Sequence, residues 1–72
     1  MITLTYFKDK EGKSYAMHFK GTFAQTVAKV HEEVFKGSGF IKTMSLNPDT
    51  GYEREITAQV RSLLARKQGR LH

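Results

Sequence analysis

The sequence has no cysteine among its 72 residues, so neither a disulfide framework nor a thiolate metal site can stabilise it. A chain of this length forms one small domain and buries only about 60% of its unfolded surface. Its core must therefore support the fold alone or together with a partner subunit. The lack of cysteine also fits a reducing compartment, and the expected location is the cytoplasm.

The sequence also has no long apolar run. No stretch approaches the roughly 20 apolar residues that a membrane-spanning helix needs. The first residues do not resemble a signal peptide either, because Thr3, Thr5 and Tyr6 interrupt their apolar character and Lys8 follows. We therefore expect a soluble protein without a membrane partner.

Acidic residues are missing from the C-terminal part of the chain. Residues 1–56 carry eight Lys and Arg against seven Asp and Glu, whereas residues 57–72 carry four basic residues and no acidic one. Most of the net charge of +5 is thus concentrated in the last sixteen residues. Such asymmetry points to a polyanionic partner, although basic residues also suit the end of a helix and keep a small protein soluble.

The stretch from Gly21 to Gly39 has the pattern of one amphipathic helix. Thr22 and Gln25 form a capping-box signature at its start, and Gly37 can end it in the left-handed conformation. Apolar residues recur at the helical period and define a wide arc: Phe23, Val27, Val30 and Val34 at its centre, with Ala24, Ala28, His31 and Phe35 widening it. So wide an arc predicts contact with more than one neighbour.

A β-hairpin is predicted before this helix, with strands from Ile2 to Tyr6 and from Ser14 to Lys20. Apolar and polar residues alternate in both strands, and the segment Asp9–Gly12 has the composition of a type I turn followed by a left-handed residue. Treating those four residues as the loop predicts three pairs, which place six apolar side chains on one face: Tyr6 with Tyr15, Leu4 with Met17, and Ile2 with Phe19.

A third strand is predicted from Phe40 to Leu46. Phe40, Met44 and Leu46 would share one side of it, and Lys42 interrupts that side. A lysine within an apolar face is typical of an edge strand or a strand end.

Residues 47–51 allow two continuations of the chain. They could close a second hairpin, but a four-residue loop would then pair Leu46 with Glu53 and Met44 with Glu55. That register places carboxylates beside the apolar side chains of the third strand, which disfavours it for a covered face.

A helix fits the residue pattern of the segment after Thr50 better than a strand does. Thr50 and Glu53 form a second capping-box signature, and Gly69 stands where a helix would end. One face of this helix would carry the apolar residues Tyr52, Ile56, Val60, Leu63 and Leu64. The predicted fold is therefore α+β with the order ββαβα, a three-stranded sheet packed on one amphipathic helix; the alternative is ββαββα with a second hairpin at residues 47–51. Residues 1–68 would form a single domain, and residues 69–72 a flexible tail.

Residues that could carry chemistry do not form a recognisable constellation. The histidines His18, His31 and His72 are scattered, and no pair has the spacing of helical metal ligands. We therefore predict no metal, no cofactor and no catalytic residues. A small basic ribonuclease stays as a third alternative, since such an enzyme needs only a few Arg, His and Glu residues.

The charge asymmetry favours a small accessory or regulatory protein that binds nucleic acid through backbone phosphates, with DNA and RNA equally open. The residues expected to bind are Arg54, Arg61, Arg66, Lys67 and Arg70, of which Arg54 and Arg61 would share the outward face of the second helix. The alternative function is a non-enzymatic protein-interaction module, an inhibitor or adaptor, that uses a bare sheet edge or the apolar arc and could form a homodimer.

Overall fold

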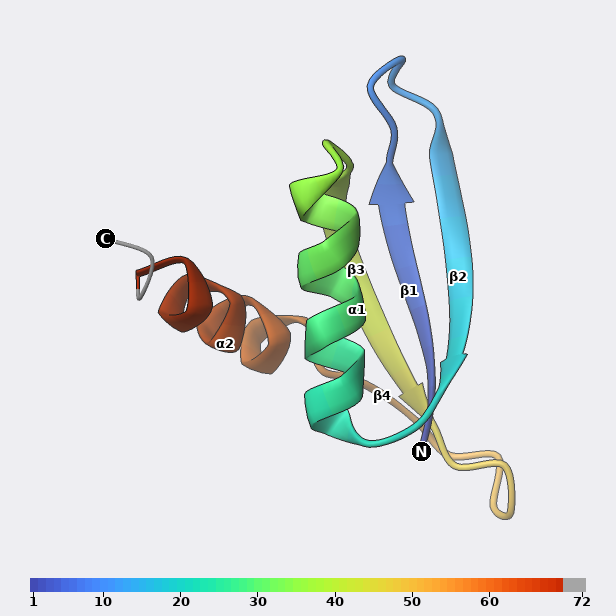
Figure 1. Cartoon of the computed structure of the whole chain (residues 1–72). Coiled ribbons are helices and arrows are strands. Elements are labelled where there is room, and N and C mark those ends of the chain that lie inside the picture. The colour runs from blue at the N-terminus through green and yellow to red at the C-terminus, as the bar shows by residue number, and fades with distance from the viewer. Residues whose placement is uncertain (70–72) are drawn as a thin grey trace.

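Four antiparallel strands form one sheet in the order β2-β1-β3-β4, and two helices pack on one side of it (Figure 1). This computed structural model describes residues 1–69, with side chains up to residue 66. The elements are β1 (Ile2–Lys8), β2 (Ser14–Lys20), α1 (Phe23–Phe35), β3 (Gly39–Leu46), β4 (Glu53–Glu55) and α2 (Thr57–Gly69). The predicted α+β class is confirmed. The three-stranded ββαβα order is wrong, and the alternative ββαββα order, with a second hairpin at residues 47–51, is the one observed.

The turn between β1 and β2 is one residue tighter than predicted. Asp9 N donates to Lys13 O at 2.9 Å, so these two residues flank a loop of only three residues. The Asp9 carboxylate accepts from the backbone N–H groups of Glu11 and Lys13, and Gly12 has a φ of 87°. This is a type I turn with a left-handed glycine bulge, a common form of three-residue hairpin loop.

This tighter loop shifts the strand register by one residue. Tyr15 lies opposite Phe7 rather than Tyr6, so the predicted pairs are wrong. Because the side-chain period of a strand is two, a shift of one residue exchanges the faces of one strand relative to the other.

The two faces of β1 consequently carry residues opposite to those expected. Thr3, Thr5 and Phe7 are buried beneath the helices, whereas Ile2, Leu4 and Tyr6 lie on the other face and are half-buried. The core contains the buried apolar residues Phe7, Val27, Val30, Ile56, Val60 and Leu64.

The boundaries of α1 agree with the sequence prediction. The Thr22 side chain accepts from Gln25 N at 3.1 Å, and the Gln25 side chain accepts from Thr22 N at 2.9 Å, which completes the capping box. At the other end Gly37 has a φ of 109°, and Ser38 N donates to Glu33 O. These are the features of a Schellman ending.

A short ion pair supports the exposed side of α1. Lys36 Nζ lies 3.2 Å from a carboxylate oxygen of Glu32, one helical turn before it. The hydrogen bond from Lys36 lowers the pKa of the Glu32 carboxyl below its ordinary value, and Lys29 adds to the effect. The same bond raises the pKa of Lys36 above its ordinary value.

The apolar arc of α1 is buried over a narrower width than predicted. Val27 and Val30 are buried, and Phe23 and Val34 pack against the core. Ala24, Ala28 and Phe35, on one flank of the arc, are instead exposed, Phe35 to 84%.

Strand β3 lies inside the sheet, between β1 and β4, and Lys42 lies within it, so neither the edge position nor the strand end predicted from Lys42 is observed. Its pairing with β1 shifts between Tyr6 and Phe7, which lie opposite Lys42 and Phe40. This bulge puts Phe40 against the core, on the opposite side of the strand from Met44 and Leu46.

A second hairpin and a later helix replace the long second helix that we predicted. Asn47 N donates to Tyr52 O, and Gly51, with a φ of 74°, closes the loop. The Thr50 hydroxyl accepts from Tyr52 N within this turn and caps no helix. Helix α2 begins at Thr57, whose hydroxyl accepts from Thr43 N at 3.1 Å where the β3–β4 ladder ends.

The structure tests only some of the predictions for the C-terminal residues. Gly69 is the last residue of α2, and residues 70–72 of the predicted tail lie outside the described residues. Within residues 1–69, neither helix combines the length and apolar character that crossing a membrane requires.

Candidate interaction surface

The side of the sheet that faces away from α1 and α2 is here called the open face. Strand pairing places eleven side chains in three rows on it: Ile2, Leu4 and Tyr6 from β1; Ala16, His18 and Lys20 from β2; Lys42, Met44 and Leu46 from β3; Glu53 and Glu55 from β4. The paired Lys8 and Ser14 lie on the same side, at the end next to the β1–β2 turn. Directly paired residues of an antiparallel sheet point to the same side, so these side chains form regular rows across the strands.

Three rows cross the open face. The first contains Lys20, Ile2, Leu46 and Glu53; the second contains His18, Leu4, Met44 and Glu55; the third contains Ala16, Tyr6 and Lys42. The two middle strands contribute the large apolar side chains, and the two outer strands contribute most of the charged ones.

The apolar centre of the open face is hollowed. A depression of about 190 Å³ is lined by Ile2, Leu4, Tyr6, His18, Met44, Leu46 and Glu53. A neighbouring depression of about 410 Å³ lies where Ile2 and Leu46 meet the end of β2. Ile2, Leu4 and Leu46 remain only half-buried, because neither helix covers this side.

The edges of the open face carry charges of opposite sign. The Lys20 ammonium group projects from β2 at one edge, next to the imidazole of His18, and the Glu53 and Glu55 carboxylates project from β4 at the other. All four side chains are exposed. The charge therefore changes from basic to acidic across the apolar centre.

The third row has its own cation. The Lys42 ammonium group lies over the Tyr6 ring, with Nζ 5.1 Å from the ring centroid. This distance is typical of a cation–π contact. The lysine that interrupts the predicted apolar side of β3 is thus held against an aromatic ring on the open face.

The basic residues predicted to bind nucleic acid do not share one helix. Arg54 lies on β4, so its predicted position on the outward face of a helix with Arg61 is wrong. Arg61 and Arg66 lie on α2 and are exposed. The side chains of Lys67 and Arg70 lie outside the described residues.

Arg61 is already engaged within the fold. Its guanidinium donates to Ile41 O at 3.0 Å and lies over the Phe40 ring, 5.2 Å from the centroid. These contacts join α2 to the bulged part of β3. Arg61 therefore has a structural role that the sequence pattern does not reveal.

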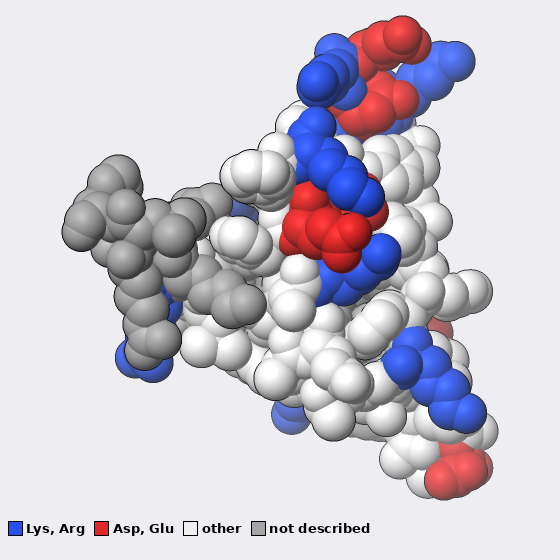
Figure 2. All heavy atoms as spheres, in the orientation of Figure 1, with Lys and Arg blue, Asp and Glu red and all other residues white. Residues whose placement is uncertain are grey.

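Charges of both signs alternate on the helix-covered side. Figure 2 shows Lys and Arg next to Asp and Glu at the β1–β2 turn and along α1, with uncharged surface between these groups. The described residues on the side seen in Figure 2 form no wide basic patch.

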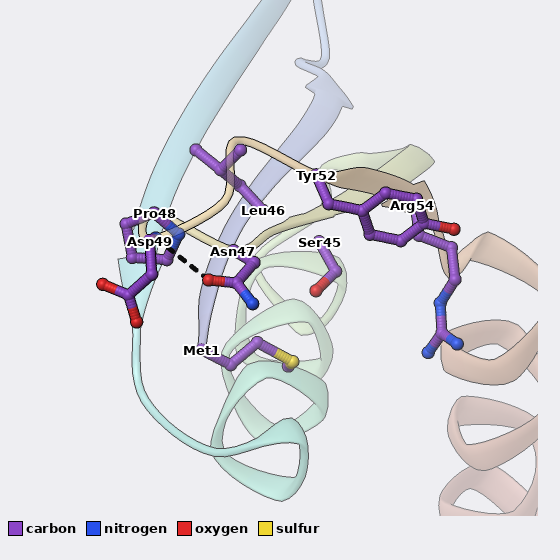
Figure 3. Close-up of a pocket in the computed structure, with 8 residues that line it drawn as sticks. All are labelled: Met1, Ser45, Leu46, Asn47, Pro48, Asp49, Tyr52 and Arg54. Atoms are coloured by element: carbon purple, nitrogen blue, oxygen red, sulfur yellow. Dashed lines mark hydrogen bonds between the residues drawn. The ribbon is translucent and has the colours of Figure 1, made fainter.

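A hollow of about 430 Å³ lies at the β3–β4 turn (Figure 3). Asp49 and Arg54 lie at its opposite sides, and Asn47 uses its side-chain oxygen to accept from Asp49 N at 3.0 Å. Ser45 and Leu46 point to opposite sides of β3 in this view. The hollow is thus lined by residues of the turn and of the β4 edge of the sheet, and its lining contains no cluster of residues typical of catalysis.

One polar cluster at the helix-covered side was missed by sequence reasoning. The Tyr15 hydroxyl is hydrogen-bonded to the Ser38 hydroxyl and lies 3.5 Å from a carboxylate oxygen of Glu33. It ties β2 to the end of α1. Within the described residues, no three His, Asp or Glu side chains come together in a way that could hold a metal ion.

Comparison with protein-family models, with curated proteins and with solved structures finds no match for this chain.

Proposed function

We propose that this chain is a non-enzymatic protein-interaction module whose interface is the open face of the sheet. The observation that carries the proposal is the distribution of residues on β1. Its helix-covered side presents two threonines and one phenylalanine, whereas its open side presents Ile2, Leu4 and Tyr6.

This distribution is unfavourable for an isolated domain. Thr5 and Thr43 are buried, and their hydroxyl oxygens have no hydrogen-bond partner. Burial of a polar group without a partner costs free energy, and apolar area left in water contributes no stabilisation. A second protein on the open face would remove Ile2 and Leu4 from water and account for their position.

The composition of the open face also fits a protein interface. Its centre is apolar with one aromatic residue, and charged residues are confined to its rim and to Lys42. Specific interfaces have this arrangement of an apolar centre and a polar rim. The regulatory role and cytoplasmic location expected from the sequence are retained as parts of the proposal.

Photo-crosslinking in cells that express the chain tests this proposal. A benzophenone amino acid replaces Tyr6 on the open face in one variant and Phe35 on the exposed flank of α1 in the control variant. We expect a discrete cross-linked product from position 6 and none from position 35. Products from position 35 alone, or from neither position, would contradict the proposal.

A second proposal concerns nucleic acid. It is supported by the exposed Arg66 and by the absence of acidic residues from position 57 onward in the sequence. In this function Arg54, Arg66, Lys67 and Arg70 bind backbone phosphates without reading bases, and Arg61, the fifth residue expected from the sequence, is held by Ile41 O and the Phe40 ring. Anisotropy titrations with DNA and RNA probes test it, and an absence of binding at low salt would exclude it.

A further inference from the structure

We infer that the partner of the open face is a second copy of this chain, related by a two-fold axis that runs along the strands between β1 and β3. The inference rests on the proposed interaction function and names its partner. It is carried by the opposite charges at the two edges of the open face.

Face-to-face packing of two identical sheets allows two aligned arrangements. Aligned sheets keep their strand directions within about 30° of each other and lie about 10 Å apart. The two-fold axis then lies between the sheets, either along the strands or across them. The strand order β2-β1-β3-β4 determines which strands meet in each case.

An axis along the strands brings opposite charges together. It places β2 of one copy over β4 of the other and keeps each row over the same row. Lys20 then faces Glu53 of the second copy, and His18 faces Glu55 of the second copy. The symmetry repeats both contacts, as in every isologous interface.

An axis across the strands brings like charges together instead. It places β2 over β2 and β4 over β4, with the rows inverted. Glu53 would face Glu55 of the second copy, which places two carboxylates against each other, and Lys20 would face His18 of the second copy and lose its contact with a carboxylate. Like charges placed opposite each other disfavour an association, so the first arrangement is selected.

The middle strands are complementary in the same arrangement. Ile2 lies over Leu46 of the second copy, and Leu4 lies over Met44 of the second copy, so that apolar side chains meet throughout the centre. Tyr6 lies over Lys42 of the second copy, which repeats between the chains the cation–π pair seen within each one.

The size of the open face predicts a reversible dimer. Strand and residue spacings give it a footprint of about 20 by 20 Å, on the order of 400 Å² on each copy. The two copies together would bury about 800 Å², which is below the roughly 1,000 Å² of a stable specific interface and typical of a weak, transient contact. Dimerisation should therefore depend on protein concentration between about 10 µM and 1 mM.

Complementary charge reversals test the arrangement by sedimentation velocity. Lys20→Glu places two carboxylates against each other at both symmetry-related contacts, and Glu53→Lys places two ammonium groups against each other there. Each variant alone should dimerise about 10- to 100-fold more weakly than the parent chain. Within one copy the two positions lie on strands three spacings apart, about 14 Å, so they do not form a pair of their own.

Mixing the two variants is the decisive step. In the mixed dimer one contact joins the carboxylate introduced at position 20 of one variant to the ammonium group introduced at position 53 of the other. The second contact joins the unchanged Lys20 to the unchanged Glu53, so both contacts are again attractive. An equimolar mixture should recover dimerisation to near the level of the parent chain.

Matched controls carry the same charge changes away from the open face. Lys13→Glu and Glu11→Lys alter exposed residues at the β1–β2 turn, beyond the three rows. Each control should leave dimerisation unchanged, alone and when the two are mixed. A weakening by the controls equal to that of the test variants would show that net charge, and not the arrangement, is being measured.

Three results would overturn the inference: a parent chain that stays monomeric to about 1 mM, a dimer that the reversals do not weaken, or a mixture that does not recover. The crosslinking experiment separates this failure from failure of the proposed function. A monomeric chain that cross-links through position 6 to a different protein retains the interface but loses the second copy. A monomeric chain that gives no product from position 6 loses both.

Discussion

The rings of Phe7 and Tyr15 stack on the helix-covered side of the sheet, with centroids 5.4 Å apart and 23° between their planes. The two residues lie directly opposite each other in the β1–β2 ladder. Phe7 also contacts Phe40 from the other neighbouring strand, at a centroid distance of 6.3 Å. Phe7 therefore joins three strands beneath the helices, whereas the adjacent Tyr6 lies on the open face.

Substitution of these two neighbours should have unequal effects. Phe7 is 1% exposed, so Phe7→Ala removes a large buried ring and should lower the free energy of unfolding by about 3–5 kcal/mol. Tyr6→Ala removes a half-buried ring from the open face and should cost less than about half as much. Urea denaturation measures both, at protein concentrations low enough to keep the chain monomeric. Equal costs would mean that the observed register is wrong.

Removal of an unpaired buried hydroxyl should stabilise the fold. Thr5 and Thr43 face each other across β1 and β3, and neither hydroxyl has a partner. Thr5→Val and Thr43→Val preserve shape and remove the polar atom, and each should raise the free energy of unfolding by about 1 kcal/mol. Thr3→Val is the control, because the Thr3 hydroxyl donates to Phe19 O at 3.5 Å and its removal should bring no gain. A stabilised Thr3→Val with unchanged Thr5→Val would contradict this account.

The Thr57 hydroxyl should matter more than the Thr57 methyl group. Thr57→Val leaves Thr43 N without its acceptor and should cost about 1–3 kcal/mol, the penalty of an unpaired buried donor. Thr57→Ser retains the oxygen and should cost less than half of that. Amide exchange measures the effect directly, because exchange at Thr43 should quicken in the valine variant only. Equal exchange in both variants would contradict the contact.

Nucleic-acid binding should depend on salt in a defined way. With three to five basic residues engaged, the log–log salt slope on duplex DNA should be about −3 to −5. Changing Arg66, Lys67 and Arg70 together to glutamine should flatten it by roughly 2–3 units, equally for every probe sequence. Glutamine substitution of the three lysines at the β1–β2 turn (Lys8, Lys10 and Lys13) is the control and should change the slope less. Equal changes would show that net charge alone determines binding.

Helix α1 was predictable because its signals are local. Thr22 and Gln25 satisfy each other's backbone groups within one turn, and Gly37 ends the helix without help from distant residues. The existence of the first hairpin was predictable for the same reason, because the turn signal at residues 9–12 is also local. Its register was not, because a loop of three residues and a loop of four place Tyr15 opposite different partners, and only the Asp9–Lys13 hydrogen bond distinguishes them.

The second hairpin was rejected for a reason that fails on this fold. Pairing of Leu46 with Glu53 and of Met44 with Glu55 is unfavourable if the face is to be covered by a helix. On the open face it is acceptable, because the carboxylates remain in water at the rim. The sequence pattern cannot show which face the helices cover, so the same acids that argued against a strand mark the edge of the candidate interface.

The candidate site was therefore predictable only in outline. The uneven charge of the sequence pointed to the C-terminal basic residues as the site. One of them, Arg61, instead donates a hydrogen bond to Ile41 O and lies over the Phe40 ring. The open face combines residues from four strands, and no local pattern in the chain joins Lys20 to Glu53 through Ile2 and Leu46. Only the strand order makes that row visible.

The central place of β1 has a consequence for how the chain folds. Strand β1 is bonded on one side to the nearby β2 and on the other to β3, whose paired residues lie roughly 30 to 45 positions further along the chain. The β1–β2 turn can close early and locally, but the hydrogen bonds between β1 and β3 require closure of a long loop around α1. The chain must therefore hold the apolar centre of its future open face exposed until β3 arrives, which makes the interval before that pairing the period of greatest aggregation risk.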